Sequence, residues 1–215
     1  ADMADRRKRV VWGPHGTRVK TSEANWGKPL AWNRKAEKSG VRAKVFCASL
    51  ADVFEDWNKE ILDHHGEVMT IGMDDLRRDL FALIDATPHL DWILLTKRPE
   101  NVLRMWPDGS FRRNIWLLTS IATQADADRN IPHLLACRDL VPVLGVSAEP
   151  LLGPIDLSPW LNQIDWVIVG GESGSDARVM YESWARTIIE QCTDAGTAVF
   201  MKQMGELWAR ANRRP

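Results

Sequence analysis

The sequence predicts an α/β fold, a partial (β/α) barrel built on parallel strands. Three observations support this prediction: short apolar runs recur along the chain, segments of helical spacing separate several of them, and polar residues follow each run. Apolar runs without alternation are typical of parallel strands that are buried on both faces. Strands that alternate with helices specify βαβ units with right-handed crossovers.

Six apolar runs are the predicted strands. Each is four to six residues long, and they cover residues 43–48, 92–95, 115–118, 141–146, 166–169 and 198–201. Helices are predicted over 74–86, 126–136 and 183–195, with Gly196 as the residue that ends the last of them. In the first helix, the spacing places Leu76, Leu80 and Leu83 on the apolar face with Ile84, and Arg77 elsewhere. An open doubly wound sheet is the alternative architecture, but its G-x-G-x-x-G fingerprint after the first strand is absent.

The amino-terminal part of the chain is expected to be less regular. Residues 1–9 have the charged character of a helix end, and residues 10–43 carry little periodicity and several glycines and prolines. We therefore predict one domain over 1–215 with three parts: a basic helix end and irregular arm over 1–44, repeated βα units over 45–206, and a tail over 207–215.

Charge is distributed unevenly along the chain. Residues 1–45 hold 12 Lys and Arg against four Asp and Glu, whereas the remaining 170 residues hold 16 against 25. A basic arm on an acidic body indicates a polyanionic partner such as nucleic acid. The alternative is a solvated helix and loop without a partner. Most of the 11 tryptophans fall in strand or helix patterns, where packing explains them.

Cysteine and hydropathy patterns exclude several classes of protein. Cys47, Cys137 and Cys192 are widely spaced and form no C-x-x-C pair, which argues against a disulfide framework and a structural zinc site. The pair His64-His65 is better explained as an exposed loop than as a metal site. No apolar run approaches the roughly 20 residues that cross a bilayer, and residues 1–10 lack the apolar segment of a secretory signal. We expect a soluble cytoplasmic protein with no membrane partner.

Polar residues follow every predicted strand, and barrel enzymes place their active sites at the carboxyl ends of their strands. A structural protein has no need to gather Lys, Arg and Glu at one end of its sheet, so these residues predict a ligand site. In chain order they are Ser49 and Asp52, then Thr96, Lys97 and Arg98, then Thr119 and Ser120, then Ser147 and Glu149, then Gly170, Gly171, Glu172 and Ser173, and finally Lys202 and Gln203.

The charged members of this set predict anion and proton chemistry. Lys97 and Arg98 form a candidate anion clamp, although a solvated strand end is the alternative. Glu149 is a candidate general acid or base, or a ligand for a cationic or hydroxyl group, unless it only ends its strand. Lys202 lies inside the last strand and requires a carboxylate partner, for which Glu149 and Glu172 are the candidates.

The remaining members are candidate hydrogen-bonding groups. Gly170-Gly171 permits positive φ and close backbone approach, and its amides could form an anion-binding nest, although the pair also suits an ordinary turn. We expect the ligand-binding set to be Ser49, Asp52, Lys97, Arg98, Ser120, Ser147, Gly170, Gly171, Ser173 and Gln203, with Glu149, Glu172 and Lys202 as catalytic candidates.

Five stretches of the chain carry a family resemblance. VFCASLADVFED (45–56), LLTKRPEN (94–101), SAEPLLGPIDL (147–157), DWVIVGGESG (165–174) and FMKQMGE (200–206) resemble a phage and prophage family of radical-SAM-like proteins of unknown function. That family is distantly similar to spore photoproduct lyase. The resemblance implies a partial (β/α) barrel that carries a [4Fe–4S] cluster and binds S-adenosylmethionine, whose radical chemistry the protein orients and shields.

The chain departs from that family at its amino-terminal end. The family's run of three cluster-binding cysteines is absent, and Cys47, Cys137 and Cys192 fall elsewhere. The first barrel strand is also expected to be missing. Either the chain is amino-terminally shortened, which we favour, or it is a member without the cluster. We expect no cofactor in this chain, and a [4Fe–4S] cluster with S-adenosylmethionine only where the cysteine motif is present.

Three functions remain open at the sequence level. The first is the barrel body of a radical-SAM-like protein that acts on a phosphate-containing or nucleic-acid-related substrate and is inactive in radical chemistry as this chain. The second is a non-catalytic nucleic-acid-binding module that uses the basic arm and its tryptophans. The third is a cluster-free barrel enzyme that acts on a phosphorylated metabolite.

Overall fold

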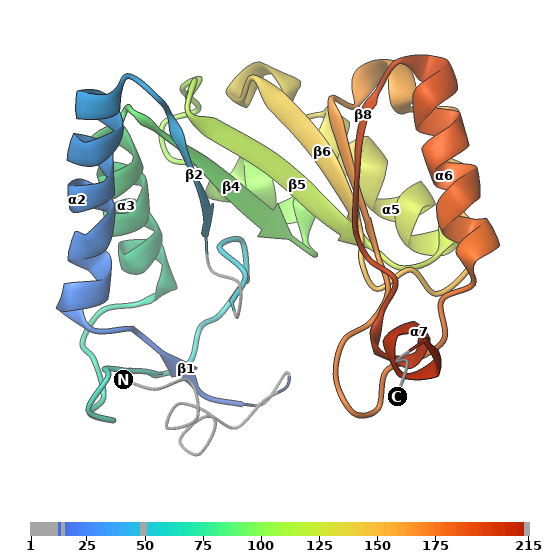
Figure 1. Cartoon of the computed structure of the whole chain (residues 1–215). Helices are drawn as coiled ribbons and strands as arrows, with labels where there is room; N and C mark the ends of the chain where they lie inside the picture. The colour runs from blue at the N-terminus through green and yellow to red at the C-terminus, as the bar shows by residue number, and fades with distance from the viewer. Residues whose placement is uncertain (1–12, 14–15, 48–50, 213–215) are drawn as a thin grey trace. The chain divides into compact units, whose positions relative to one another are not determined.

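A computed structural model describes residue 13, residues 16–47 and residues 51–212 (Figure 1). The chain divides into two compact units, which we describe separately. One unit is made of Ala1–Ala43 and Glu55–Leu90, and the other of Lys44–Phe54 and Asp91–Pro215. The assignment of the whole chain to one domain stays a prediction.

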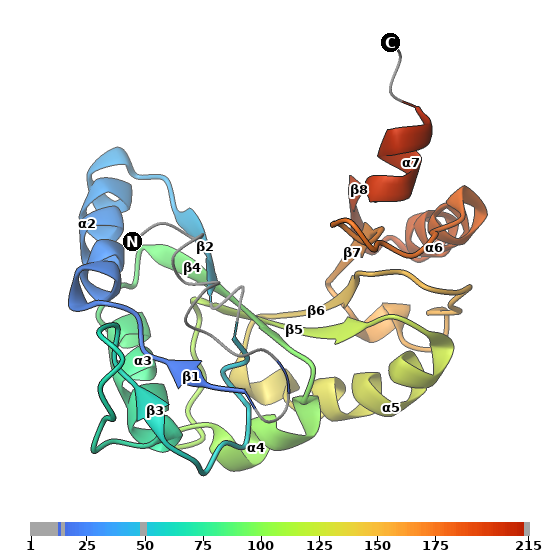
Figure 2. The ribbon, with the colours of Figure 1, turned by 90° about the horizontal axis from the view of Figure 1, so that it is seen from below.

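A six-stranded parallel sheet is the centre of the second unit. Its strands lie in the order β2 (Ala43–Cys47), β4 (Leu90–Thr96), β5 (Ile115–Ile121), β6 (Val143–Ala148), β7 (Trp166–Gly170) and β8 (Ala198–Gln203). The sheet curls into a half-barrel (Figures 1 and 2). All six predicted strands are confirmed, and each neighbour in this order is also the next large strand along the chain, as successive βαβ units require.

Helices cover one face of this sheet. α5 (Gln124–Leu135) packs on β5, and α6 (Glu182–Ala195) packs on β7 and β8. Side chains that are fully buried lie on this face, among them Leu117, Leu144 and Val167. α5 begins with a capping box, in which the Thr123 hydroxyl and the Asp126 carboxylate accept each other's backbone N–H groups. As predicted, Gly196 ends α6, with a φ of 71°.

The opposite face of the sheet, which we call the inner face, is apolar but less buried. Ile93, Leu118 and Ile168 form its buried cluster, and Trp116 and Trp166 pack against that cluster while remaining partly exposed. The two indoles meet edge to face, with centroids 5.6 Å apart and planes at 85°. Alternation along each strand places these residues together, because side chains two positions apart share a face.

The second unit also contains short helical segments. α4 (Val102–Met105) follows a 3₁₀ turn over Pro99–Asn101, and two further 3₁₀ turns lie at Arg138–Leu140 and Leu161–Gln163. α7 (Glu206–Ala211) follows β8 directly. Among the described residues, none of the helices combines the length and the apolar composition that a bilayer crossing requires.

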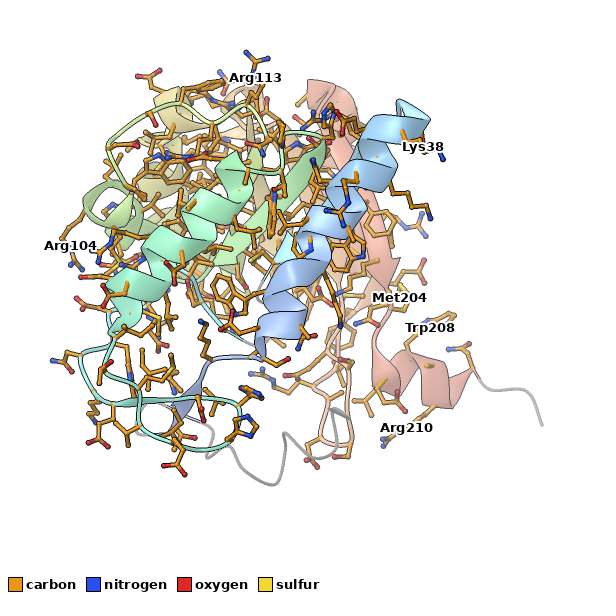
Figure 3. The ribbon with its side chains drawn as sticks, turned by 90° about the vertical axis from the view of Figure 1, so that its left-hand side faces the viewer. Lys38, Arg104, Arg113, Met204, Trp208 and Arg210 are labelled. Atoms are coloured by element: carbon orange, nitrogen blue, oxygen red, sulfur yellow. The ribbon has the colours of Figure 1, made fainter. Side chains whose placement is uncertain are left out.

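The first unit contains α2 (Glu23–Ser39), α3 (Met73–Asp85) and a two-stranded parallel sheet of β1 (Arg18–Val19) and β3 (Ile61–Leu62). α2 and α3 lie side by side (Figure 3). The Arg18 guanidinium binds both carboxylate oxygens of Glu55, at 2.6 and 2.7 Å, and stacks 4.1 Å above the Trp57 ring. This charged pair ties β1 to the segment that precedes β3.

The prediction of an irregular arm was wrong for α2. The helix runs through Gly27 and Pro29 and ends at Gly40, whose φ of 68° is left-handed. Proline in a helix interior removes one backbone hydrogen bond and costs about 3 kcal/mol. Pro29 and Ala36, seven positions apart on the same side of the helix, are both buried. Packing of this side offsets a local preference against the helix.

The buried face of α3 also differs from the prediction. The helix is present, but Arg77, Phe81 and Ile84 are its buried residues, whereas Leu76, Leu80 and Leu83 are only partly buried. Arg77 is buried because its guanidinium has partners: it binds the Asp74 carboxylate and donates to the Glu55 carbonyl oxygen at 3.2 Å. A hydrogen-bonded guanidinium can therefore occupy a position that periodicity assigns to the polar side.

Candidate functional site

The predicted site residues lie at the carboxyl edge of the sheet in the second unit. Register pairs across neighbouring strands bring the strand ends together, with Thr96 opposite Thr119 and Ser120 opposite Ser147. Gly170 lies opposite Gln203 on the next pair of strands. Ser49 lies outside the described residues. Most of the other predicted residues fall into four groups. Two are hydrogen-bonded clusters around Asp52 and Glu149, the third is a pair of serines, and the fourth is an ion pair within a loop.

The first group, which we call the Asp52 cluster, is saturated with hydrogen bonds. One carboxylate oxygen of Asp52 accepts from the Thr96 hydroxyl at 2.8 Å and from the Phe54 amide at 3.0 Å. The other accepts from the Lys97 amide at 2.9 Å and from the Arg98 guanidinium at 3.1 Å. The Asp52 side chain is only 13 % exposed. Because four donors bind one carboxylate, Asp52 has a structural role and links the segment after β2 to the end of β4.

Lys97 differs from the rest of the Asp52 cluster. Its backbone amide is used by Asp52, but its side chain is exposed and forms no ion pair with any residue that the structure describes. Arg98, the other half of the predicted anion clamp, is held by the Asp52 carboxylate. Of the two cations, Lys97 is therefore the one available to a ligand.

The second group, the Glu149 cluster, joins β8 to the residue that follows β6. One Glu149 carboxylate oxygen accepts from the Lys202 ammonium at 2.8 Å, and the other accepts from the Gln203 amide at 3.1 Å. Of the two carboxylates proposed as partners for Lys202, the structure selects Glu149. Its side chain is 20 % exposed, whereas that of Lys202 is 51 % exposed. The pair thus presents a cation toward solvent and a carboxylate below it.

A break in strand pairing sets the position of Lys202. Val169 pairs with Met201 and Gly170 pairs with Gln203, so Lys202 is an extra residue in β8. An extra residue of this kind re-aims the side chains beside it and is often found next to functional sites. The break in pairing therefore lies at the residue that forms the ion pair with Glu149. In a regular strand the Lys202 side chain would have a different orientation.

Gly170 and Gly171 are needed for close packing. A Cβ on Gly170 would lie 3.3 Å from the Glu149 side chain, and one on Gly171 would lie 2.5 Å from the Met204 carbonyl oxygen. Neither glycine has a positive φ. The Gly171 amide donates to the Gln203 carbonyl oxygen at 2.9 Å, so the suggestion that it forms an anion-binding nest was wrong.

Glu172 belongs to a loop brace. Its carboxylate accepts from the Arg178 guanidinium at 2.8 and 2.9 Å and from the Arg178 backbone amide at 2.8 Å. The side-chain hydrogen bonds from Arg178 lower the pKa of Glu172 to about 2. This carboxylate is therefore ionised at neutral pH and occupied by its own loop. The neighbouring Ser173 is exposed.

Ser120 and Ser147 lie side by side on the inner face, next to the Glu149 cluster. The Ser120 hydroxyl donates to the Glu149 carbonyl oxygen at 3.4 Å. Ser147 is 3 % exposed as a residue, and its hydroxyl makes no hydrogen bond with any described residue. Since no buried side-chain oxygen of the described residues lacks a hydrogen-bond partner, this hydroxyl is open to solvent, and Ser147 is a candidate donor to a ligand.

Sequence analysis missed the aromatic residues beneath these serines. Trp116 shares a face with Leu118 and Ser120, and the Lys44 ammonium lies 5.0 Å from the Trp116 ring centroid. Trp166 packs edge-on against Trp116. The signal was present in the spacing, because Trp116 and Ser120 are four positions apart and alternation places both on one side of a strand. The strand pattern by itself predicts only a packing role for these tryptophans.

A small pocket lies apart from these residues. Its volume is about 210 Å³, and it is lined by Met180 in the loop before α6, by Met204 between β8 and α7, and by Trp208 on α7. Ligand pockets in proteins usually measure roughly 300–1,000 Å³. No predicted site residue lines this pocket, so we do not assign the site to it.

The three cysteines do not fit an iron–sulfur cluster. Cys47 is in β2, Cys137 follows α5 and Cys192 is in α6. Burial raises their pKa values to about 12, 11 and 11, whereas cluster iron requires thiolates close together. No group of three His, Cys, Asp or Glu residues in the described chain could hold a metal. The thiols of the described chain therefore provide no cluster site.

Comparison with known proteins identifies one family. A family described as "Protein of unknown function (DUF5131)" matches residues 2–214. No curated protein and no solved structure matches the chain. The family's description states no reaction, cofactor or source, so the radical-SAM and phage resemblance stays a prediction.

Proposed function

We propose that this chain, which belongs to the DUF5131 family of proteins of unknown function, binds a small phosphate-containing ligand at the carboxyl edge of its half-barrel. The Glu149 cluster is the observation that carries the proposal. Glu149 holds Lys202 at the edge of the inner face while half of the Lys202 side chain remains exposed. A cation that is positioned but not enclosed suits an anionic ligand.

Hydrogen-bonding capacity supports the same ligand class. An ammonium group has three donors, and the Glu149 carboxylate occupies one donor of Lys202, at 2.8 Å. The Ser147 hydroxyl adds a donor without a described partner, and the exposed Lys97 adds a second cation on the same edge. A phosphate group offers three acceptor oxygens and a negative charge, which these donors match.

The inner face supplies an apolar surface beside these donors. Trp116 is partly buried there, below Ser120 on β5, and Trp166 on β7 and Leu95 on β4 are partly buried on the same face. Ligand sites commonly combine an apolar lining with a few polar groups that fix orientation. A nucleotide has this composition, with a flat base for the aromatic surface and a phosphate for the cations.

We place this site in the body of a radical-SAM-like protein, following the resemblance of five stretches of the sequence. S-adenosylmethionine would also suit the edge, since Glu149 can accept from its ammonium group and Lys202 can donate to its carboxylate. Because the described thiols do not fit a cluster, we derive no radical step. Glu149 and Lys202 remain the proton-transfer candidates, since Arg178 occupies Glu172.

A cluster-free enzyme acting on a phosphorylated metabolite would use the same edge. The carboxylate and ammonium of the Glu149 cluster could serve as base and acid toward such a substrate. Neither assignment predicts a cluster on the described thiols of this chain, so turnover separates the two. Turnover of a phosphorylated metabolite by the iron-free chain, lost in Lys97→Ala, would favour the cluster-free enzyme.

The test is calorimetric titration of the whole chain with ATP, AMP and S-adenosylmethionine. We expect Lys202→Ala to weaken binding of the best of these probes about tenfold or more, because a charge-assisted hydrogen bond contributes about 1.5–3 kcal/mol. Glu149→Gln should weaken binding less, since Lys202 remains. Arg186→Ala is the matched control, because Arg186 forms an exposed pair with Glu182 on α6.

Two outcomes would overturn the proposal. One is no heat of binding from ATP or AMP at millimolar concentration, whether or not S-adenosylmethionine, which carries no phosphate, binds. The other is an equal loss of affinity in Lys202→Ala and Arg186→Ala, which would show that overall charge, and not the Glu149 cluster, determines binding.

A further inference from the structure

The solvent side of α2 carries an unusual combination of charge and aromatic surface. Residues 16–44 hold eight Lys and Arg against two Glu. Helical spacing places Lys28, Trp32 and Lys35 on one side of α2, because residues three and four apart are neighbours. Trp32 is 45 % exposed. Lys38 lies at the end of the same helix (Figure 3).

Trp32 differs from the other described tryptophans of the first unit. The ring of Trp26 has the Lys20 ammonium 5.3 Å from its centroid. The ring of Trp57 is covered by Arg18 at 4.1 Å and by Lys59 at 5.5 Å. Trp32 has no ring or cation partner among the described residues, so its indole face is open to an external group.

The cations around Trp32 are also uncompensated. Lys35 forms no ion pair with any residue in the described part of the chain, and Lys28 only donates to the Asn25 side chain at 2.7 Å. Glu37 is on the opposite side of α2, near His89, with 3.6 Å between Nε2 and the carboxylate. Positive charge on this side is therefore not neutralised within the helix.

We propose that α2 is a binding surface for single-stranded nucleic acid, with a base stacked on Trp32 and backbone phosphates bound by Lys28 and Lys35. The two lysines are about 10 Å apart along the helix axis, on either side of the indole. Base stacking on exposed aromatic side chains, flanked by cations, is the general mode of sequence-tolerant single-strand binding. This surface is independent of the proposed ligand site, which lies in the other unit.

Charge and shape select this partner over others. An acidic protein would be attracted by the lysines but would gain little from a solitary exposed indole. A duplex offers phosphates, yet its bases are already stacked, so Trp32 would contribute nothing. Single strands present both groups at once.

The experiment is fluorescence anisotropy of an end-labelled dT₁₂ titrated with the whole chain. We expect Trp32→Ala to weaken binding about tenfold and Trp32→Phe to restore most of the loss, because phenylalanine also stacks. The double variant Lys28→Ala/Lys35→Ala should reduce the slope of log affinity against log salt by about 1.4, the value for two lost phosphate contacts on a single strand. Trp208→Ala is the matched control, since Trp208 is 46 % exposed on α7.

Any of three results would overturn the inference. They are no binding of dT₁₂ in 50 mM salt, equal effects of Trp32→Ala and Trp208→Ala, and tighter binding of a 12-base-pair duplex than of dT₁₂. Circular dichroism of each variant identifies a loss of folding, in which case the dT₁₂ titration of Trp32→Phe decides the outcome. These results do not depend on ATP, AMP or S-adenosylmethionine binding, so the two proposals can fail separately.

Discussion

Two carboxylates at the same edge of one sheet have opposite surroundings. Asp52 receives four hydrogen bonds from the end of β4 and its own loop, whereas Glu149 receives two from neighbouring residues of β8. The partner cation of Asp52 supports a junction, and the partner cation of Glu149 extends toward solvent. The position after a strand therefore predicts which polar residues lie at this edge. The number of hydrogen-bond donors around each carboxylate then distinguishes a structural role from availability to a ligand.

Removal of the Asp52 carboxylate should have the largest effect on stability. We expect Asp52→Ala to lower the free energy of unfolding by about 3 kcal/mol, because two backbone amides, a hydroxyl and a guanidinium lose their acceptor in a largely buried setting. Glu149→Ala should cost about 1 kcal/mol or less. Urea unfolding followed by circular dichroism measures both, with Asp194→Ala, an exposed position on α6, as the control. Equal losses at Asp52 and Glu149 would contradict the distinction.

Substitution of the glycines beside Glu149 should have the second-largest effect on the free energy of unfolding. Gly171→Ala should lower the free energy of unfolding by about 2 kcal/mol, because its Cβ would meet the Met204 carbonyl oxygen at 2.5 Å. Gly170→Ala should cost less, since its Cβ meets only the Glu149 side chain, at 3.3 Å, but it should displace that carboxylate and weaken ligand binding. Gly153→Ala, where a Cβ meets nothing within 4 Å, is the control. A Gly171→Ala chain as stable as Gly153→Ala would be inconsistent with the close approach.

The smallest expected effect concerns the Glu172–Arg178 brace and depends on pH. The pKa of Glu172 is lowered to about 2 in the folded chain, against about 4.3 when unfolded. Its contribution to stability is therefore complete above about pH 4.5 and is lost as the pH falls toward 2. We expect the difference in urea midpoint between the natural chain and Arg178→Gln to be constant from pH 7 to 5 and to shrink below. A difference that does not change with pH would show that the brace acts through packing alone.

The sheet was predictable because its strands are coded locally. Runs such as 115–118 and 166–169 are apolar on both faces, and each became a buried strand at the predicted place. α2 was not predictable in this way, because Gly27 and Pro29 oppose a helix that packing of Pro29 and Ala36 stabilises. Burial of Arg77 likewise depends on Glu55, which is 22 residues away in the chain.

The residues of the site could be predicted from the sequence, but the way they pair in space could not. Lys202 inside an apolar strand required a carboxylate, and Glu149 provides it. Nothing in the local sequence shows that Arg98 is taken by Asp52 or Glu172 by Arg178, because these pairs form only when loops meet. The open hydroxyl of Ser147 and the open ring of Trp32 are recognised only from the neighbours that each one lacks among the described residues.

The extra residue in β8 has a consequence for how this family can vary. Since Lys202 stands outside the regular pairing of β7 with β8, deleting its single codon would let Met201 and Gln203 continue one uninterrupted ladder. Such a deletion would remove the cation without breaking a strand. An in-frame loss of three nucleotides would then give a folded chain that lacks the cation of the proposed ligand site.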